Sequence, residues 1–424
     1  MFLQKCTLVC SRSLSRSAVS KILSPAFTLD KEWSARHSEL KRLVGGDYEW
    51  ISAVQKKFIG GGYASAVDVD AAVCIAEQKD QVNDVLELLY KLRHTEVASE
   101  LAESSEYAIV RLLLKFDADV LFTVVNDPIN YGIFLNEHSA CLAIDHFVKR
   151  NNYQGAARLV SFVMQQEQTD NELLNLLGLY TCSKWVELPK DQQTLPLPVE
   201  DEEEVNDDDV RTFKFPYLKN AHFDSHFDLD QPAHLVGKSL FWIARSTKSI
   251  DQQLSTSLQL LGAVLYDKHD LAESLASSST TPQVANVVRQ ILTPTEEGAE
   301  VTPAAQKILE KLPPASETTE QLSTIVQGAL EKIQSAEEKS LGQEQVSKFT
   351  LWNERRQELV KAQAQRVLLK VRAEEIKQEL DKLDREEERM GFFVKRLWYE
   401  KKAAENEQIE QEAKERNDKV AAQA

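Results

Sequence analysis

The 424-residue sequence has few of the residues that build loop-rich or disulfide-stabilised folds. It contains 14 glycines and 12 prolines, too few for a β protein with many tight turns. It has five cysteines. Beyond Cys10, only the isolated Cys74, Cys141 and Cys182 remain, and they match neither a disulfide framework nor a CxxC metal motif. We therefore predict that these three are buried free thiols.

Long apolar runs and enzyme motifs are also absent. No segment approaches about 18 consecutive apolar residues, so the sequence predicts no membrane span. It has no GxSxG, Walker or HExxH motif. One stretch, His222–Asp228, alternates two His with two Asp between Pro216 and Pro232, but it lacks a recognisable scaffold for a metal. We therefore predict a non-enzymatic protein with no cofactor, metal or small-molecule substrate.

Acidic residues are absent from the first 29 positions, which carry Lys5, Arg12, Arg16 and Lys21 among six serines. This composition is typical of a mitochondrial transit peptide. The apolar residues are interrupted by Arg and Ser, which disfavours a secretory signal; a disordered basic tail is the other alternative. We predict that residues 1–29 are a leader and that the protein resides in the mitochondrial matrix.

Residues 30–188 contain paired amphipathic helices. The clearest pair lies within Phe134–Glu167, where one apolar face runs from Ala140 to Val148 and another from Ala156 to Met164. Val85, Val120 and Ala156 are separated by 35 and 36 residues, a period typical of tetratricopeptide and pentatricopeptide repeats. A single hairpin cannot bury its own apolar face, so we predict an all-α solenoid of stacked helical hairpins.

The rest of the chain divides by composition. We predict an acidic linker over 189–212, a continued helical segment over 213–277, and a Pro/Ser/Thr-rich linker over 278–320 with one helical island around Val284–Leu292. Between Leu359 and Leu397, apolar residues recur at heptad spacing with Arg366 and Glu387 as the exceptions. Residues 321–424 are therefore predicted to form a long, charged, coiled-coil-like helix that packs on an earlier helix, a second copy or another protein.

Six segments resemble the pentatricopeptide-repeat family of the mitochondrial ribosomal small subunit. They are Leu89–His94, Leu114–Ala118, Tyr131–Phe134, Asp145–Lys149, Asn152–Tyr153 and Val163–Glu167, in matching order and spacing. The resemblance implies a structural subunit that contacts small-subunit ribosomal RNA and neighbouring ribosomal proteins and supports mitochondrial translation. The alternatives are a free mitochondrial RNA-processing or stability factor and a solenoid adaptor that binds only proteins.

Four cations near the ends of first helices are the candidate RNA contacts: Arg111, Lys115, Lys149 and Arg150. In the family that the chain resembles, repeats that read RNA bases carry an aromatic residue and an Asn at two positions of the first helix. This chain has Ala140 and Cys141 there, so we do not expect this repeat to read bases. We expect the cations to contact phosphates instead. A net charge of −17 restricts such contact to a local patch, and Lys near a helix C-terminus also stabilises the helix dipole.

Overall fold

The computed structural model describes residues 22–59, 62, 64–197, 229–293, 302–314 and 320–421. These residues are helical and contain no strand, which confirms the predicted all-α fold. No helix among them is long and apolar enough to cross a membrane. The chain divides into two compact units, Met1–Trp352 and Asn353–Ala424. Most of the predicted leader, the acidic run from residue 200 and His222–Asp228 lie outside the described residues.

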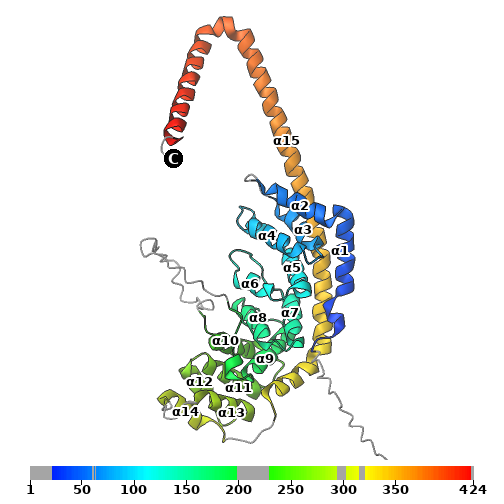
Figure 1. Cartoon of the computed structure of the whole chain (residues 1–424), viewed down its shortest axis with the longest axis vertical. Coiled ribbons are helices and arrows are strands. Elements are labelled where there is room, and N and C mark those ends of the chain that lie inside the picture. Colours follow the sequence, from blue (N-terminus) through cyan, green and yellow to red (C-terminus); the bar gives the residue numbers. More distant parts are fainter. Residues whose placement is uncertain are drawn as a thin grey trace, which may run out of the picture. The chain divides into compact units, whose positions relative to one another are not determined.

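The first unit is an array of helical pairs (Figure 1). Its helices are α1 Asp30–Val44, α2 Asp47–Lys57, α3 Ala66–Ile75, α4 Gln81–Arg93, α5 Glu103–Phe116, α6 Val120–Asn126, α7 Glu137–Lys149, α8 Tyr153–Gln165, α9 Glu172–Val186, α10 Pro232–Ser246, α11 Gln252–Leu265, α12 His269–Leu275, α13 Pro282–Leu292 and α14 Pro303–Lys311. Helices α3, α5, α7 and α9 begin at intervals of 37, 34 and 35 residues, and each packs on the next. The array therefore has the period near 35 that the sequence predicts.

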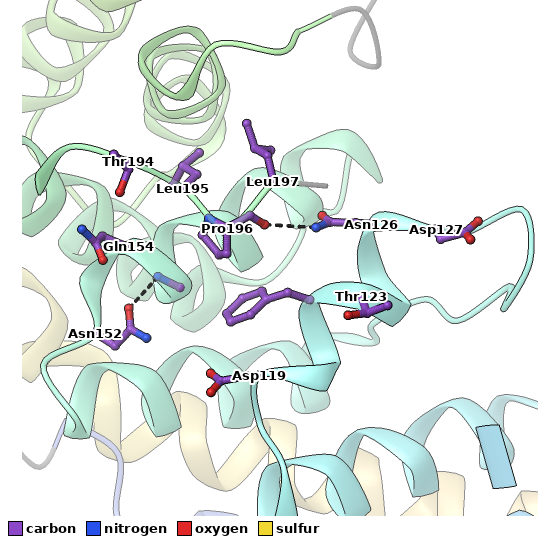
Figure 2. A pocket seen from close by; sticks show the side chains of 12 residues that line it. Asp119, Thr123, Asn126, Asp127, Asn152, Gln154, Thr194, Leu195, Pro196 and Leu197 are labelled. Atoms are coloured by element: carbon purple, nitrogen blue, oxygen red, sulfur yellow. Dashed lines mark hydrogen bonds between the residues drawn. The ribbon is translucent and has the colours of Figure 1, made fainter. Parts of the chain in front are cut away.

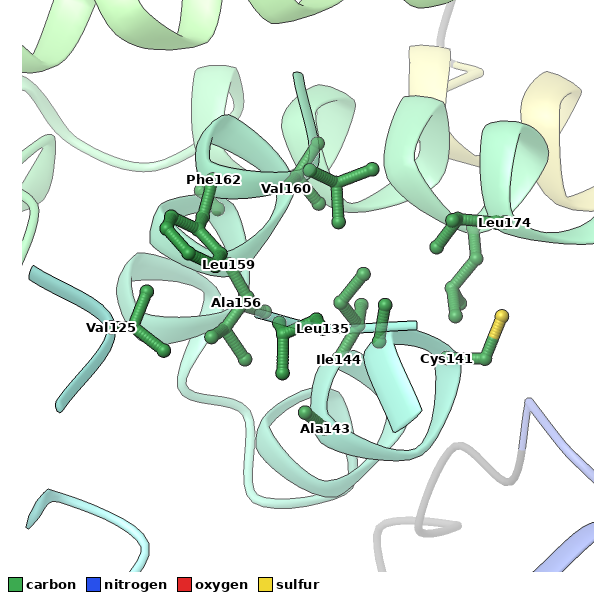
Figure 3. Close-up of a cluster of buried hydrophobic side chains, with 14 of the residues drawn as sticks. Val125, Leu135, Cys141, Ala143, Ile144, Ala156, Leu159, Val160, Phe162 and Leu174 are labelled. Carbon is green, nitrogen blue, oxygen red and sulfur yellow. The ribbon is translucent and has the colours of Figure 1, made fainter. Parts of the chain in front are cut away.

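The pair α7 and α8 shows how the sequence forms one unit. Asn136 caps α7 in a capping box with Ser139, and the side chain of Asn152 accepts a hydrogen bond from the Gly155 amide at the start of α8. The facing sides of both helices supply a buried apolar cluster, in which Ile144 and Ala156 are labelled (Figure 3). This cluster continues into the neighbouring pairs, as a solenoid requires.

The array extends further along the chain than the sequence predicts. Helix α10 packs on α8, α9 and α11, so the pairing resumes beyond the acidic segment. Helices α13 and α14 lie within the range predicted as a linker, where they pack on α11 and α12. Helix α13 coincides with the predicted helical island, whereas the linker assignment is wrong for the residues of α14. The reason is that Pro282 and Pro303 occupy the first turns of these helices, a position that tolerates proline because its missing amide has no partner there.

Two further segments complete the first unit. Residues 22–29 include the short 3-10 helix η1, Pro25–Thr28, and bury Ile22, Leu23 and Phe27. The predicted leader, residues 1–29, therefore includes a segment that packs with the array. Helix α15, Leu322–Ala421, begins in this unit and buries Phe349 and Trp352 against Tyr107.

The second unit, Asn353–Ala424, contains the remainder of α15. Its backbone leaves helical geometry at Lys395, where φ is −111° and ψ is 20°. The large apolar side chains from Leu368 to Leu397 whose exposure is described are each about half to nine tenths exposed. The coiled-coil-like pattern thus lies on a helix whose apolar side is uncovered within this unit.

Candidate nucleic-acid interface

The four candidate cations lie on α5 and at the C-terminal end of α7. Arg111 and Lys115 are one helical turn apart on α5, while Lys149 is the last residue of α7 and Arg150 is its C-cap. Arg111, Lys115 and Lys149 line one cavity of about 530 Å³ with the carboxylates of Asp30, Glu77 and Asp145. The structure thus brings three predicted residues together, although acidic groups surround them.

Arg111 anchors the segment formed by residues 22–29. Its guanidinium donates to the carbonyl of Thr28 at 2.6 Å and forms an ion pair with Asp30 at 2.5 Å. The same group stacks over the ring of Trp33 at 5.4 Å, and its side chain is 14% exposed. A phosphate could reach Arg111 only by displacing these partners, so its role is structural.

A chain of hydrogen bonds continues from Arg111 into the core. Its guanidinium donates to the Tyr107 hydroxyl at 3.2 Å, and this hydroxyl lies 3.1 Å from Nδ1 of His138. The other imidazole nitrogen, Nε2, lies 2.9 Å from the carbonyl of Phe27. Burial lowers the pKa of His138 to about 4, so the ring is neutral, Nε2–H donates to Phe27 and Nδ1 accepts from Tyr107. Sequence inspection missed this network because its members are scattered along the chain.

Lys149 forms an ion pair with the buried carboxylate of Asp145. Asp145 also accepts a hydrogen bond from the backbone amide of Leu23 at 3.2 Å. Burial raises the pKa of Asp145, and the bond to Lys149 opposes that rise. Replacement of Lys149 by Glu would leave a buried carboxylate beside a second acid, so this variant cannot separate RNA contact from folding.

Lys115 and Arg150 are the two candidates whose charged groups remain available to contact RNA. Both residues are exposed, and no carboxylate of the described residues forms an ion pair with either one. The Lys115 ammonium lies 4.8 Å from the ring centroid of Phe116. Burial and, to a smaller extent, the positive charges of Arg150 and Lys149 lower the pKa of the half-buried His146 to about 4.

The two positions that correspond to base-reading residues in pentatricopeptide repeats lie inside the protein. Ala140 and Cys141 are both fully buried, so neither side chain can reach a base. Cys74 and Cys182 are buried free thiols as well, which confirms the prediction for all three. Among the residues that the structure describes, no group of three His, Cys, Asp or Glu side chains could hold a metal ion.

A second cavity, of about 720 Å³, lies between α6, the start of α8 and residues 194–197 (Figure 2). Asn126 donates across it to the carbonyl of Pro196 at 3.0 Å. Asp119 and Asp127 are its charged lining residues, and no cation lines it. No sequence pattern predicts this cavity, and its acidic lining is unsuited to phosphate.

One comparison with known families bears on these observations. A family profile described as "Mitochondrial 28S ribosomal protein S27" matches residues 1–382. The match covers the array and the part of α15 up to residue 382. It therefore spans both the candidate RNA contacts and the network that holds residues 22–29.

Proposed function

Because the chain belongs to the mitochondrial 28S ribosomal protein S27 family, we propose that it is a structural subunit that contacts small-subunit ribosomal RNA and neighbouring proteins. Family membership makes it a small-subunit ribosomal protein of the mitochondrial matrix. The proposal adds that its contribution to translation is architectural rather than catalytic. The observation that carries it is the family match over residues 1–382.

The distribution of polar contacts supports an architectural role. Arg111 and Lys149 are engaged by Asp30 and Asp145, and the base-reading positions are buried. The contact with RNA that we propose is therefore made by Lys115 and Arg150, which meet phosphates at the edge of the array. Such contact positions the protein without reading sequence.

Sucrose-gradient fractionation of mitochondria tests the main proposal. We expect the protein to co-migrate with the small subunit at close to one copy per particle, with crosslinks to its ribosomal RNA. Complete absence from that particle would contradict the proposal. Crosslinks confined to messenger transcripts would instead favour a free RNA-processing factor, and absence of any RNA crosslink a protein-only adaptor.

The double substitution Lys115→Glu and Arg150→Glu tests the phosphate contact. We expect RNA crosslinking to fall several-fold and the salt dependence of binding to weaken by about one unit of slope per lost contact. The thermal melting of the array should not change appreciably, because both side chains are exposed.

The matched control is Lys248→Glu with Lys307→Glu, which changes charge equally at exposed positions after α10 and on α14. We expect it to retain the RNA crosslink. Equal crosslinking by both double variants and the unmodified protein would remove Lys115 and Arg150 as contacts while leaving the ribosomal assignment intact.

A further inference from the structure

The exposed part of α15 carries an apolar stripe that ends one residue before the break at Lys395. The stripe consists of Ala362, Arg366, Leu369, Ala373, Ile376, Leu380, Leu383, Glu387, Met390 and Val394, spaced alternately by four and three residues. Leu369 is 70% exposed and Leu383 is 60% exposed. A stripe of this spacing runs along one side of a helix for roughly 50 Å at 1.5 Å per residue.

The charges that flank the stripe change sign at its middle. Those on the N-terminal half are basic: Arg366 within the stripe and Lys370, Arg372 and Lys377 beside it. Those on the C-terminal half are acidic: Glu387 within the stripe and Glu379, Asp384 and Glu386 beside it. A helix with this pattern is complementary to a copy of itself that runs in the opposite direction.

We propose that residues 362–394 pair antiparallel with the same residues of a second copy of this chain, about a twofold axis at Gln378. This inference is independent of the proposed RNA contact. It concerns the free protein, in which the apolar stripe has no partner among the residues of its own unit.

The antiparallel register packs the whole stripe without a gap. Ile376 lies opposite Leu380 of the second copy, and the small Ala373 lies opposite the larger Leu383. At the ends, Ala362 lies opposite Val394, so the last pair falls just before the helix break. Alternation of small and large side chains across layers is what close helix packing requires.

The same register brings opposite charges together. Lys370 faces Asp384 of the second copy, and Arg372 faces Glu386. Arg366 and Glu387 occupy adjacent layers, so each can meet the other within the seam. At the axis, Lys377 faces Lys377 of the second copy, and Glu379 faces Glu379. The dimer therefore has two like-charged pairs and six oppositely charged pairs, because each of the three favourable contacts occurs twice.

A parallel pairing of the same stripe would place like charges together throughout. Arg366 would face Arg366 and Glu387 would face Glu387 in the seam. Beside the seam, Arg372 would meet Lys377, and Glu379 would meet Asp384. Charges at these flanking positions decide partner and direction in coiled coils, so the sequence favours the antiparallel form.

The exposed ion pairs within this unit do not oppose the proposal. Arg372 pairs with Glu375 at 3.1 Å, and Glu387 pairs with Lys395 at 3.4 Å. All four side chains are more than half exposed, so these pairs contribute little and can exchange for intermolecular ones.

Two complementary charge variants of the full chain test the inference. One carries Lys370→Glu and Arg372→Glu, and the other carries Asp384→Lys and Glu386→Lys. By sedimentation equilibrium, we expect the unmodified chain to reach twice its monomer mass. The association constant of each variant alone should fall at least tenfold. An equal mixture of the two variants should recover the dimer. A monomeric unmodified chain at roughly 100 µM would overturn the proposal and indicate that another protein or RNA covers the stripe.

A matched control and a direction test complete the experiment. The control, Asp381→Lys with Glu388→Lys, makes the same charge change on the far side of the helix and should leave the dimer intact. Lys377→Cys should form a disulfide-linked dimer, whereas Leu369→Cys should not, because Leu369 faces Glu387 in the antiparallel register. The opposite crosslinking result, or a mixture of charge variants that stays monomeric, would overturn the antiparallel pairing.

Discussion

At the scale of single residues, position in the fold determines which of the four candidate cations remain available to contact RNA. The sequence alone does not distinguish Arg111, Lys115, Lys149 and Arg150, since each is a basic residue in or directly after a first helix. The fold provides carboxylates for Arg111 and Lys149 and leaves Lys115 and Arg150 exposed. Asp145 is buried, so loss of Lys149 would leave an unpaired charge in the interior. Asp30 is exposed, and Arg111 is held instead by its own burial, by its hydrogen bond to the Thr28 carbonyl and by the ring of Trp33. Two of the four are therefore structural.

The hydrogen-bond chain through His138 makes stability depend on pH. The pKa of His138 is about 4 in the folded protein and about 6.5 when it is unfolded. As pH falls below 6.5 the unfolded chain binds a proton that the folded chain excludes, so the free energy of unfolding decreases until the pH reaches about 4. The full effect is up to about 3 kcal/mol.

We predict that His138→Gln makes urea unfolding less dependent on pH between 6.5 and 4. The variant should also lose about 1–2 kcal/mol at pH 7.5, because Tyr107 or the Phe27 carbonyl would lose hydrogen-bonding geometry. The control His94→Gln replaces an exposed ring and should retain the unmodified pH dependence. An unchanged pH dependence in the His138 variant would show that its proton does not govern acid unfolding.

At the scale of elements, residues 22–29 belong to the folded array. They bury Ile22, Leu23 and Phe27 and supply backbone partners to His138, Asp145 and Arg111. The sequence places this segment in the leader because it lacks acidic residues. Composition describes only the residues of the segment itself. Its contacts depend on helices that lie more than a hundred residues away along the chain. We propose that any leader ends before Ile22.

Two truncations test this boundary. A chain that begins at Ile22 should unfold with the same free energy as the full chain. A chain that begins at Asp30 should lose several kcal/mol, because burial of each large apolar side chain contributes about 1.5–3 kcal/mol and buried polar groups would lose partners. Urea unfolding of both chains measures the difference; equal midpoints would return the boundary to residue 29.

Before its break at Lys395, helix α15 places apolar residues in two different environments. Its first part buries Leu322, Val326 and Leu330 in the array's core and Phe349 and Trp352 in an aromatic cluster, whereas beyond residue 367 its large apolar side chains are exposed. Both parts are amphipathic, so periodicity predicts the helix in each. Periodicity alone does not predict what covers an apolar face, because a helix of the same chain and a helix of a separate chain can bury that face equally well.

At the scale of the whole molecule, a net charge of −17 is compatible with RNA contact because charge is distributed unevenly. Eight acidic residues lie between 200 and 209, far along the chain from Lys115 and Arg150. Electrostatic interactions between exposed charges are screened over about 8 Å at physiological salt. Local charge therefore matters more to the proposed contact than the overall sum.

The sequence by itself determined the all-α fold, the helical pairs and the buried cysteines, because apolar periodicity and capping residues such as Asn136 and Asn152 act within a few positions. Only the tertiary structure decided that Pro303 begins a helix of the array, that residues 22–29 are packed, and that Lys149 forms an ion pair with the buried Asp145. These outcomes depend on neighbours distant along the chain. A local pattern fixes which face is apolar, and the packing of the whole array fixes what that face meets.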